Sequence, residues 1–484
     1  MAKRDELLAV VRARLERVGD EQQWSSVLES AAWTEARDLA AAIVGRHDPQ
    51  AWIALGWLHW CRHQAAPEDA KEQERAASMF TRAFVAGAEF GEFPPPMLPL
   101  LAERAASTAL DWSGALSDAH DPEQVVALVA LWQRIVRATP ADAPARWSYL
   151  GNLGAAQRRR FMDSGVLADL DSAIVATETA LATAPSGAPG RGGLTGNLGI
   201  MLQARYERSG VLTDLDRAII VIEAAVAATE TDPDTHELCL VNLGNALRTR
   251  YDRVGADEDL HAAISATERA LTLSPADPSA LGNLGMMLAS RFQRDGAPAD
   301  IERAIECLRR AVDARPGAAP TRCGPLSALG NALRLRHEHS HDPADLDEAV
   351  AVMDAAVAAA EQHPLRGTIL ANAATVLLAR ARHTGAPDDL DRAITTTEAA
   401  IAALPEDNPS RAGFVANLGR MFQERYERTG TTDDLNSAIA TLEKAVTSAP
   451  ATSCARRICT TSGSCCATVR KAPTPWPTWI RPSR

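Results

Sequence analysis

Aromatic residues are scarce in this 484-residue sequence. They make up 5% of the chain, although apolar residues make up 46%, and alanine is the commonest apolar residue. Small and straight-chain residues favour α-helices, whereas strands are enriched in aromatic and β-branched residues. This composition predicts closely packed helices and argues against a sheet-rich fold.

Long apolar runs are also absent. No stretch approaches the roughly 18 apolar residues that span a membrane. Residues 1–20 alternate charged and apolar residues without a hydrophobic core, so they are not expected to form a signal peptide. The cysteines of the first 450 residues are scattered, which indicates thiols of a reducing cytoplasm and predicts a cytoplasmic protein. They are Cys61, Cys239, Cys307 and Cys323.

Catalytic signatures are missing too. The sequence lacks H-E-x-x-H, a phosphate-binding G-x-x-x-x-G-K-[ST] and G-x-S-x-G. Cys61 and His63 share one predicted helix, and no third group supports them as nucleophile and base. A histidine tract at 337–341 is expected in an exposed turn between helices, where it would bind metal only adventitiously. We therefore expect no enzyme activity, no cofactor and no physiological metal site.

Acidic residues outnumber basic residues in the sequence. The net charge is −12, and without residues 451–484, which hold six basic residues and no acid, 44 basic residues face 62 acidic ones. An acidic surface repels phosphate, so nucleic acid and anionic membranes are not expected partners. The sequence gives no indication of an oligomeric state.

What the sequence does contain is a long repeat. Two marker phrases keep one register, with steps of 45, 45, 41, 45, 44 and 45 residues. The first is Asn-Leu-Gly or a weaker copy of it, and the second begins with Asp-Leu or Asp-Ile. The first phrase starts at Asn152, Asn197, Asn242, Asn283, Ala328, Asn372 and Asn417, and the second at Asp169, Asp214, Asp259, Asp300, Asp345, Asp389 and Asp434.

Each unit is predicted to form two helices. In the second copy, the first helix covers residues 194–208, and Gly210 ends it in a left-handed conformation. Thr213 or Asp214 is expected to cap the second helix, whose apolar residues recur at helical spacing from Leu215. One hairpin cannot bury both of its faces, whereas stacked hairpins can. The pattern therefore predicts an all-α solenoid, a superhelix with a concave and a convex surface.

The units resemble tetratricopeptide repeats (TPR). In the third unit, Gly244, Ala263, Ala270 and Pro275 stand at the small-residue and proline positions of that family. The resemblance covers roughly residues 50–450 and implies a surface that binds a peptide or helix of another protein. The longer unit, with Arg-Tyr-x-Arg-x-Gly followed by Asp-Leu-Asp-x-Ala-Ile, is similar to the arrays beside caspase-like (CHAT) peptidase domains in bacteria.

Three regions are predicted. Residues 1–93 form an amino-terminal helical cap with one degenerate TPR-like unit, and residues 97–450 form the repeat array. Residues 451–484 lack the pattern and hold four clustered cysteines without zinc-site spacing. We interpret this tail as frameshifted and unstructured, because back-translation in another frame restores Leu-Gly and Ala-Asp-Leu-Asp near the expected positions.

Two ladders are candidate sites. The asparagines at 152, 197, 242, 283, 372 and 417 are expected on the concave face, where an amide can bind a peptide backbone; the alternative is that each bonds to a neighbouring repeat or is solvated. The arginines are expected to be structural, because each could form a fork-like hydrogen bond with the aspartate nine residues on; the alternative is that they clamp an acidic partner. These arginines are Arg160, Arg205, Arg250, Arg291, Arg336, Arg380 and Arg425.

Two functions follow from these observations. The preferred hypothesis is a non-catalytic scaffold whose concave groove binds a peptide or helix of a partner protein. The rival hypothesis is the regulatory arm of a truncated CHAT cysteine peptidase whose catalytic domain is missing from this chain.

Overall fold

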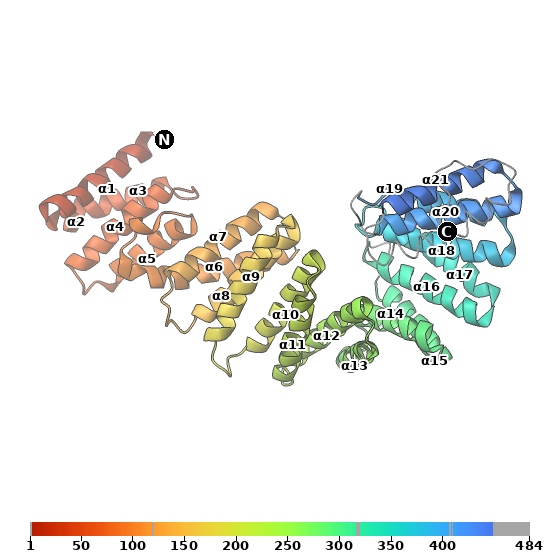
Figure 1. Ribbon diagram of the computed structural model, residues 1–484. Coiled ribbons are helices and arrows are strands. Elements are labelled where there is room, and N and C mark those ends of the chain that lie inside the picture. Colours follow the sequence, from red (N-terminus) through yellow and green to blue (C-terminus); the bar gives the residue numbers. More distant parts are fainter. Residues whose placement is uncertain (1, 119–120, 316–319, 406–407, 409, 449–484) are drawn as a thin grey trace, which may run out of the picture. The chain divides into compact units, whose positions relative to one another are not determined.

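The chain is all-helical wherever its structure is described. The computed structural model describes residues 2–118, 121–315, 320–405, 408 and 410–448, so the predicted tail and its frameshift lie outside it. Over the described residues the chain forms 21 α-helices and three short 3₁₀-helices and contains no strand (Figure 1). The predicted all-α fold is confirmed.

The helices follow one another with short connections. Their bounds are α1 (Ala2–Glu21), α2 (Ser25–Leu28), α3 (Ser30–Ala42), α4 (Pro49–Ala65), α5 (Ala70–Val85), η1 (Phe90–Glu92), η2 (Pro95–Met97), α6 (Leu98–Asp118), α7 (Pro122–Ala138), α8 (Arg146–Ser164), α9 (Leu167–Thr183), α10 (Arg191–Ser209), α11 (Leu212–Ala228), α12 (Pro233–Val254), α13 (Asp257–Leu273), α14 (Pro278–Asp295), α15 (Pro298–Asp313), η3 (Pro320–Arg322), α16 (Cys323–Ser340), α17 (Pro343–Ala359), α18 (Arg366–Thr384), α19 (Pro387–Ala402), α20 (Arg411–Thr429) and α21 (Thr432–Ser448).

Two compact units make up the chain, Met1–Cys239 and Leu240–Arg484, and the division falls within α12. Within each unit the helices pack as consecutive pairs. The first unit contains the pairs α4/α5, α6/α7, α8/α9 and α10/α11. The second contains α14/α15, α16/α17, α18/α19 and α20/α21 (Figure 1). This stacking of hairpins confirms the predicted α-solenoid.

In six of the seven repeats of the array, a glycine in the first helix allows the two helices of a pair to approach closely, and α18 has Ala374 in its place. A Cβ added to Gly285 in α14 would lie 2.5 Å from Leu308 Cγ and 3.0 Å from the carbonyl oxygen of Ala304, both on α15. Gly56 in α4 faces the ring of Phe80 in α5 in the same way. The glycine of the repeated phrase is therefore required by packing.

The turn between paired helices is partly as predicted. Gly210 follows α10 with φ +71°, so the left-handed helix end is confirmed. The cap prediction is wrong. Helix α11 begins at Leu212, Val211 stands at its N-cap without a side-chain hydrogen bond, and Thr213 and Asp214 lie inside the first turn. The Asp214 carboxylate is instead bound by Arg205.

The second unit curves toward its first helices. The backbone of α16 approaches both α14 and α18 within 8 Å. The second helices of neighbouring pairs are instead bridged by long side chains, as in the Arg303–Glu268 and Arg309–Glu348 ion pairs. Because first helices approach more closely than second helices, the face made by α12, α14, α16 and α18 is the inner face of this unit.

Tryptophan gives the amino-terminal hairpins a larger core. Trp132 in α7 is fully buried, and Trp57 in α4 packs edge-on against Phe80 and donates a hydrogen bond from Nε1 to the carbonyl oxygen of Glu92.

Among the described helices, none combines the length and the apolar character that a membrane-spanning helix needs.

Replacing Gly285 with alanine tests the close approach. The added Cβ must separate α14 from α15, so Gly285→Ala should lower the free energy of unfolding by about 1–3 kcal/mol despite alanine's better helix propensity. Gly413→Ala in α20 is the control, because a Cβ there meets nothing within 4 Å. Thermal unfolding followed by circular dichroism compares the two. Equal melting temperatures would contradict the packing role.

Candidate functional site

In each of the seven repeats, an arginine and an aspartate form a bidentate ion pair, which we call the fork. In all seven pairs the arginine Nε and Nη2 both donate to the carboxylate nine residues on, at 2.7–3.1 Å and 2.5–2.7 Å respectively. The aspartate side chains are only 5–15% exposed. The arginine lies near the end of the first helix and the aspartate in the first turn of the second. The fork therefore joins the two helices across their turn.

Four of these arginines also contact the preceding hairpin. Arg205 reaches Asp171, Arg336 reaches Glu302, Arg380 reaches Asp347 and Arg425 reaches Asp391, at 2.6–3.3 Å. The hydrogen bond with its own aspartate is the main cause that raises the pKa of each of these four guanidinium groups. Each of these guanidinium groups therefore binds two carboxylates of the array itself.

A second arginine ladder was missed by the sequence reasoning. Arg191, the first residue of α10, donates from Nη1 to the carbonyl oxygens of Leu181 and Ala184 at 2.7 and 2.9 Å. Arg146 and Arg411 bind the end of the preceding second helix in the same way. Each stands six residues before the asparagine of its repeat, and that spacing was the available signal. These arginines satisfy carbonyl groups that a helix end leaves unpaired.

The asparagine ladder lies half-buried on the first helices. Asn283 donates from Nδ2 to Asn245 at 2.7 Å, and Asn372 donates to Ser327 at 3.0 Å, so both bond to a neighbouring repeat. Asn417 accepts from Arg420 on its own helix. The other ladder members are also partly buried; they are Asn152, Asn197 and Asn242.

A groove of about 500 Å³ lies on the inner face of the second unit. We call it the first-helix groove, because its lining comes from α12, α14, α16 and α18 and from Leu365 just before α18. Its apolar lining includes Met286, Leu335 and Ile369. Its uncharged polar lining includes Asn331, whose side chain makes no hydrogen bond within the described part of the chain, and Asn372. Asn331 lies one helical turn beyond Ala328, where the asparagine ladder is interrupted, and was not predicted.

The charge of this groove is of one sign. Arg248 in α12 and Arg334 in α16 line it, and no carboxylate does among the described residues. Each arginine binds an acid four residues on through Nη1, Arg248 at 2.8 Å from Asp252 and Arg334 from Glu338. Burial raises the pKa of Asp252, although the charge of Arg248 opposes this. The lining of the groove therefore carries two cations, each paired with an acid outside that lining.

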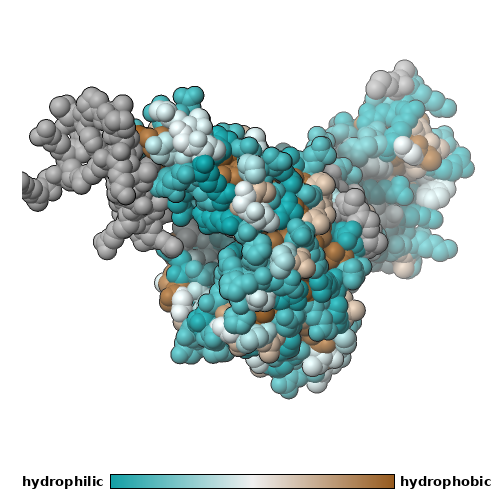
Figure 2. Space-filling view, turned by 90° about the vertical axis from the view of Figure 1, so that its right-hand side faces the viewer, coloured by the Kyte–Doolittle hydropathy of each residue, from teal (hydrophilic) through white to brown (hydrophobic). Residues whose placement is uncertain are grey.

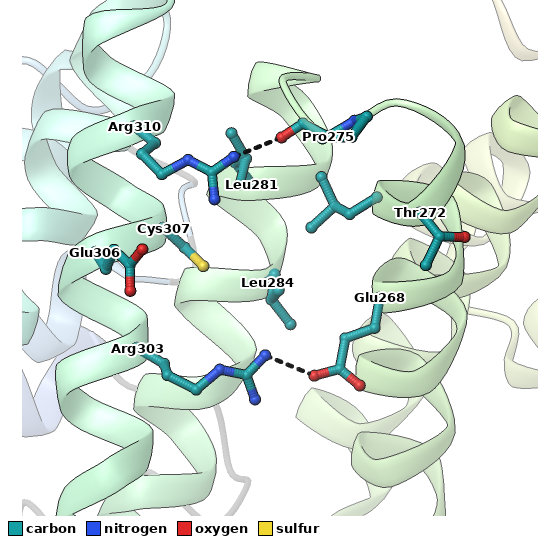
Figure 3. A pocket seen from close by; sticks show the side chains of 10 residues that line it. Glu268, Thr272, Pro275, Leu281, Leu284, Arg303, Glu306, Cys307 and Arg310 are labelled. Carbon is teal, nitrogen blue, oxygen red and sulfur yellow. Dashed lines mark hydrogen bonds and ion pairs between the residues drawn. The ribbon is translucent and has the colours of Figure 1, made fainter.

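A second cavity, of about 400 Å³, lies on the outer side of the same unit between α13 and α15. Figure 3 shows Leu281 and Leu284 of α14 between them, and Arg303 bound to Glu268 across the opening. Arg310 donates to the carbonyl oxygen of Pro275 at 2.7 Å. The junction is four residues shorter here, and Asp277 occupies the position of the junction arginine, so less of the chain covers this cavity.

On the face seen in Figure 2, hydrophilic residues predominate and apolar residues are scattered among them.

The histidine tract lies at the end of a helix, whereas a turn between helices was expected. Helix α16 continues to Ser340, and His341 ends it with φ +62°, the position that glycine occupies in other repeats. His337 is buried, with Nδ1 2.6 Å from the carbonyl oxygen of Asp342, and its ring packs edge-on against His383. Residues 338–341 are exposed as expected, so only His337 departs from the expected exposure.

No catalytic or metal cluster emerges from the described residues. They include no group of three or more His, Cys, Asp or Glu side chains placed to hold a metal. The four cysteines that they contain are free and buried, and burial raises the pKa of each thiol, that of Cys61 to about 11. A thiol with a raised pKa is a poor nucleophile at neutral pH.

A buried ionic network joins α4 to α5 and was also missed. Glu72 lies 2.6 Å from His59 Nδ1 and accepts from Arg75 at 2.7 Å, while Arg62 Nε lies 3.3 Å away. Burial opposes ionisation of Glu72, but the hydrogen bond with His59 and the nearby positive charges outweigh it and lower its pKa to about 2. Arg75 also lies 4.4 Å from the ring of Trp33.

Breaking one fork should destabilise its hairpin. Arg336→Met leaves the buried Asp345 carboxylate without its guanidinium, which should cost about 3 kcal/mol. The control is Arg309→Met, whose ion pair with Glu348 is exposed and should contribute less than about 1 kcal/mol. Amide hydrogen exchange in α16 and α17 measures the local effect. Similar protection in both variants would show that the fork is not structural.

The Glu72 network should make the amino-terminal hairpins sensitive to acid. A folded-state pKa of about 2 lies below the usual 4.5, so the network stabilises the fold above pH 4.5 and loses that stabilisation as the pH falls toward 2. Glu72→Gln should lower the melting temperature at pH 7 and flatten its decline between pH 5 and 3. Glu68→Gln, at an exposed position just before α5, should leave the profile unchanged. Parallel pH profiles for wild type and Glu72→Gln would refute this assignment.

Comparisons with known proteins agree with the repeat pattern. A solved tetratricopeptide repeat protein from Parabacteroides merdae matches 66% of this chain and 98% of its own, at 15% identity and a TM-score of 0.43. A tetratricopeptide repeat protein from Thermus thermophilus matches 47% of this chain and 98% of its own, at 21% identity and a TM-score of 0.34. None of the curated proteins matches. The family model for the tetratricopeptide repeat matches residues 238–272 and 279–315, and at these residues the chain therefore carries tetratricopeptide repeats.

Proposed function

We propose that the chain is a non-catalytic scaffold whose first-helix groove binds a peptide segment of another protein. The observation that carries this proposal is the groove itself, a hollow of about 500 Å³ lined by four successive repeats on the inner face of the second unit. A preformed surface of packed helices needs little ordering when a partner binds, which favours affinity. The buried free thiols support action in a reducing compartment such as the cytoplasm.

The lining suits an extended segment. Asn331 can donate to and accept from a peptide backbone, and Met286, Leu335 and Ile369 offer apolar contacts beside it. Two members of the asparagine ladder have a different role, because Asn283 and Asn372 bond to neighbouring repeats. Peptide contact is therefore expected to depend on the groove as a whole more than on the ladder.

A regulatory arm of a CHAT peptidase stays a prediction from the sequence resemblance. The described cysteines are buried in helices, so a nucleophile would have to come from residues encoded beyond the array. Reading the gene across codons 445–484 and downstream tests this hypothesis, and an unchanged frame with a stop after codon 484 would reject it.

Filling the groove should abolish binding. Ala289 of α14 lines the groove, and Ala289→Trp places a large uncharged side chain in it. Ala262→Trp is the matched control, at an exposed position of α13, a second helix. Random 12-residue peptides displayed on phage are selected on the immobilised full-length chain, and synthetic copies are measured by fluorescence polarisation. Peptides that bind wild type and Ala262→Trp but not Ala289→Trp are expected. If no peptide shows this dependence, the proposal fails.

A further inference from the structure

One position of the first-helix groove alternates between cation and small residue. Arg248, Ala289 and Arg334 occupy equivalent positions on α12, α14 and α16, because they are separated by the repeat steps of 41 and 45 residues. All three line the groove. Two guanidinium groups therefore stand on either side of a gap that alanine leaves open on α14.

Both arginines retain donors that the array does not use. Nη2 of each makes no hydrogen bond within the described part of the chain, and the Nε atoms are buried and have no partner there either. Each guanidinium binds its acid through Nη1 alone. A buried donor without a partner is costly, and an acceptor that reaches it recovers that cost. This distinguishes them from the fork arginines, whose Nε and Nη2 are both bound to the repeat aspartates.

The spacing between the two arginines sets a length. Packed helices lie about 8–10 Å apart, so α12 and α16, with α14 between them, are separated by roughly 16–20 Å. An extended peptide rises about 3.3 Å per residue, which makes this distance five or six residues. Carboxylates that meet both arginines would therefore be five or six positions apart in sequence.

We propose that the first-helix groove recognises an extended internal segment with two acidic side chains five or six residues apart and an apolar residue between them. The two carboxylates accept from Arg248 and Arg334. The intervening apolar side chain lies over Ala289, beside Met286 and Leu335. Charge complementarity favours this partner, since the described lining has two cations and no carboxylate. This inference rests on the proposed function, that the groove binds a peptide.

The peptides selected on the full-length chain test this inference directly. Those that depend on the groove, by the Ala289→Trp criterion, should carry Asp or Glu at this spacing. Replacing either acid with its amide in a synthetic peptide should weaken binding by about tenfold or more, since charge-assisted hydrogen bonds are the strong ones. Shifting the two acids to adjacent positions should weaken binding as much. Added salt should weaken the acidic peptide more than its amide form.

Reciprocal variants assign each acid to its arginine. Arg334→Gln should weaken binding of the acidic peptide as much as amidation of one acid does. Combining Arg334→Gln with amidation of the acid that meets Arg334 should cause little further loss of affinity. Arg248→Gln should do the same for the other acid. Groove-dependent peptides without spaced acids, or peptides insensitive to both variants, would overturn this inference while leaving peptide binding intact. Equal binding of a 12-nucleotide single-stranded DNA would also overturn it in favour of a general anion site.

Discussion

The fork between an arginine of the first helix and an aspartate of the second is the interaction on which the hairpin depends. It recurs in all seven repeats with nearly constant geometry. It holds a carboxylate in the first turn of the second helix, where negative charge also favours the helix dipole. Several second helices accordingly begin without a side-chain cap, at Val166, Val211, Ala256, Ala297 and Ala386.

The fork and the packing glycine together decide which surface is left for a partner. In six of the seven repeats the glycine lets the first helix pack closely on its second helix, and in at least four repeats the fork arginine also binds the preceding hairpin. In every fork arginine both Nε and Nη2 are therefore held by a carboxylate of the array. The arginines of the first-helix groove lie two residues earlier in the same helices, at Arg248 and Arg334, and keep their Nε donors.

Much of this architecture could be predicted from the sequence, because it repeats. The register and the nine-residue spacing of arginine and aspartate are local features that recur in every unit, and the helix end at glycine recurs in six of the seven. The errors arose where a side chain has a partner that the pattern does not name. Asp214 does not cap α11 because Arg205 holds it, and His337 is buried because His341 adopts the left-handed conformation. Asn331 and the groove could not be predicted from the repeat pattern, because the residues around them lie in other repeats, about 40 residues away along the chain.

The single step of 41 residues has a consequence for how such an array can change. It removes four residues at one junction, between α13 and α14, and keeps the helices on either side in register. A junction can thus be shortened without loss of the stack, and whole units between two cations can be duplicated or deleted in the same way. Such recombination would alter the distance between Arg248 and Arg334 in steps of one helix spacing. The spacing of the acidic residues that the array recognises would then be set by the number of repeats between its two arginines.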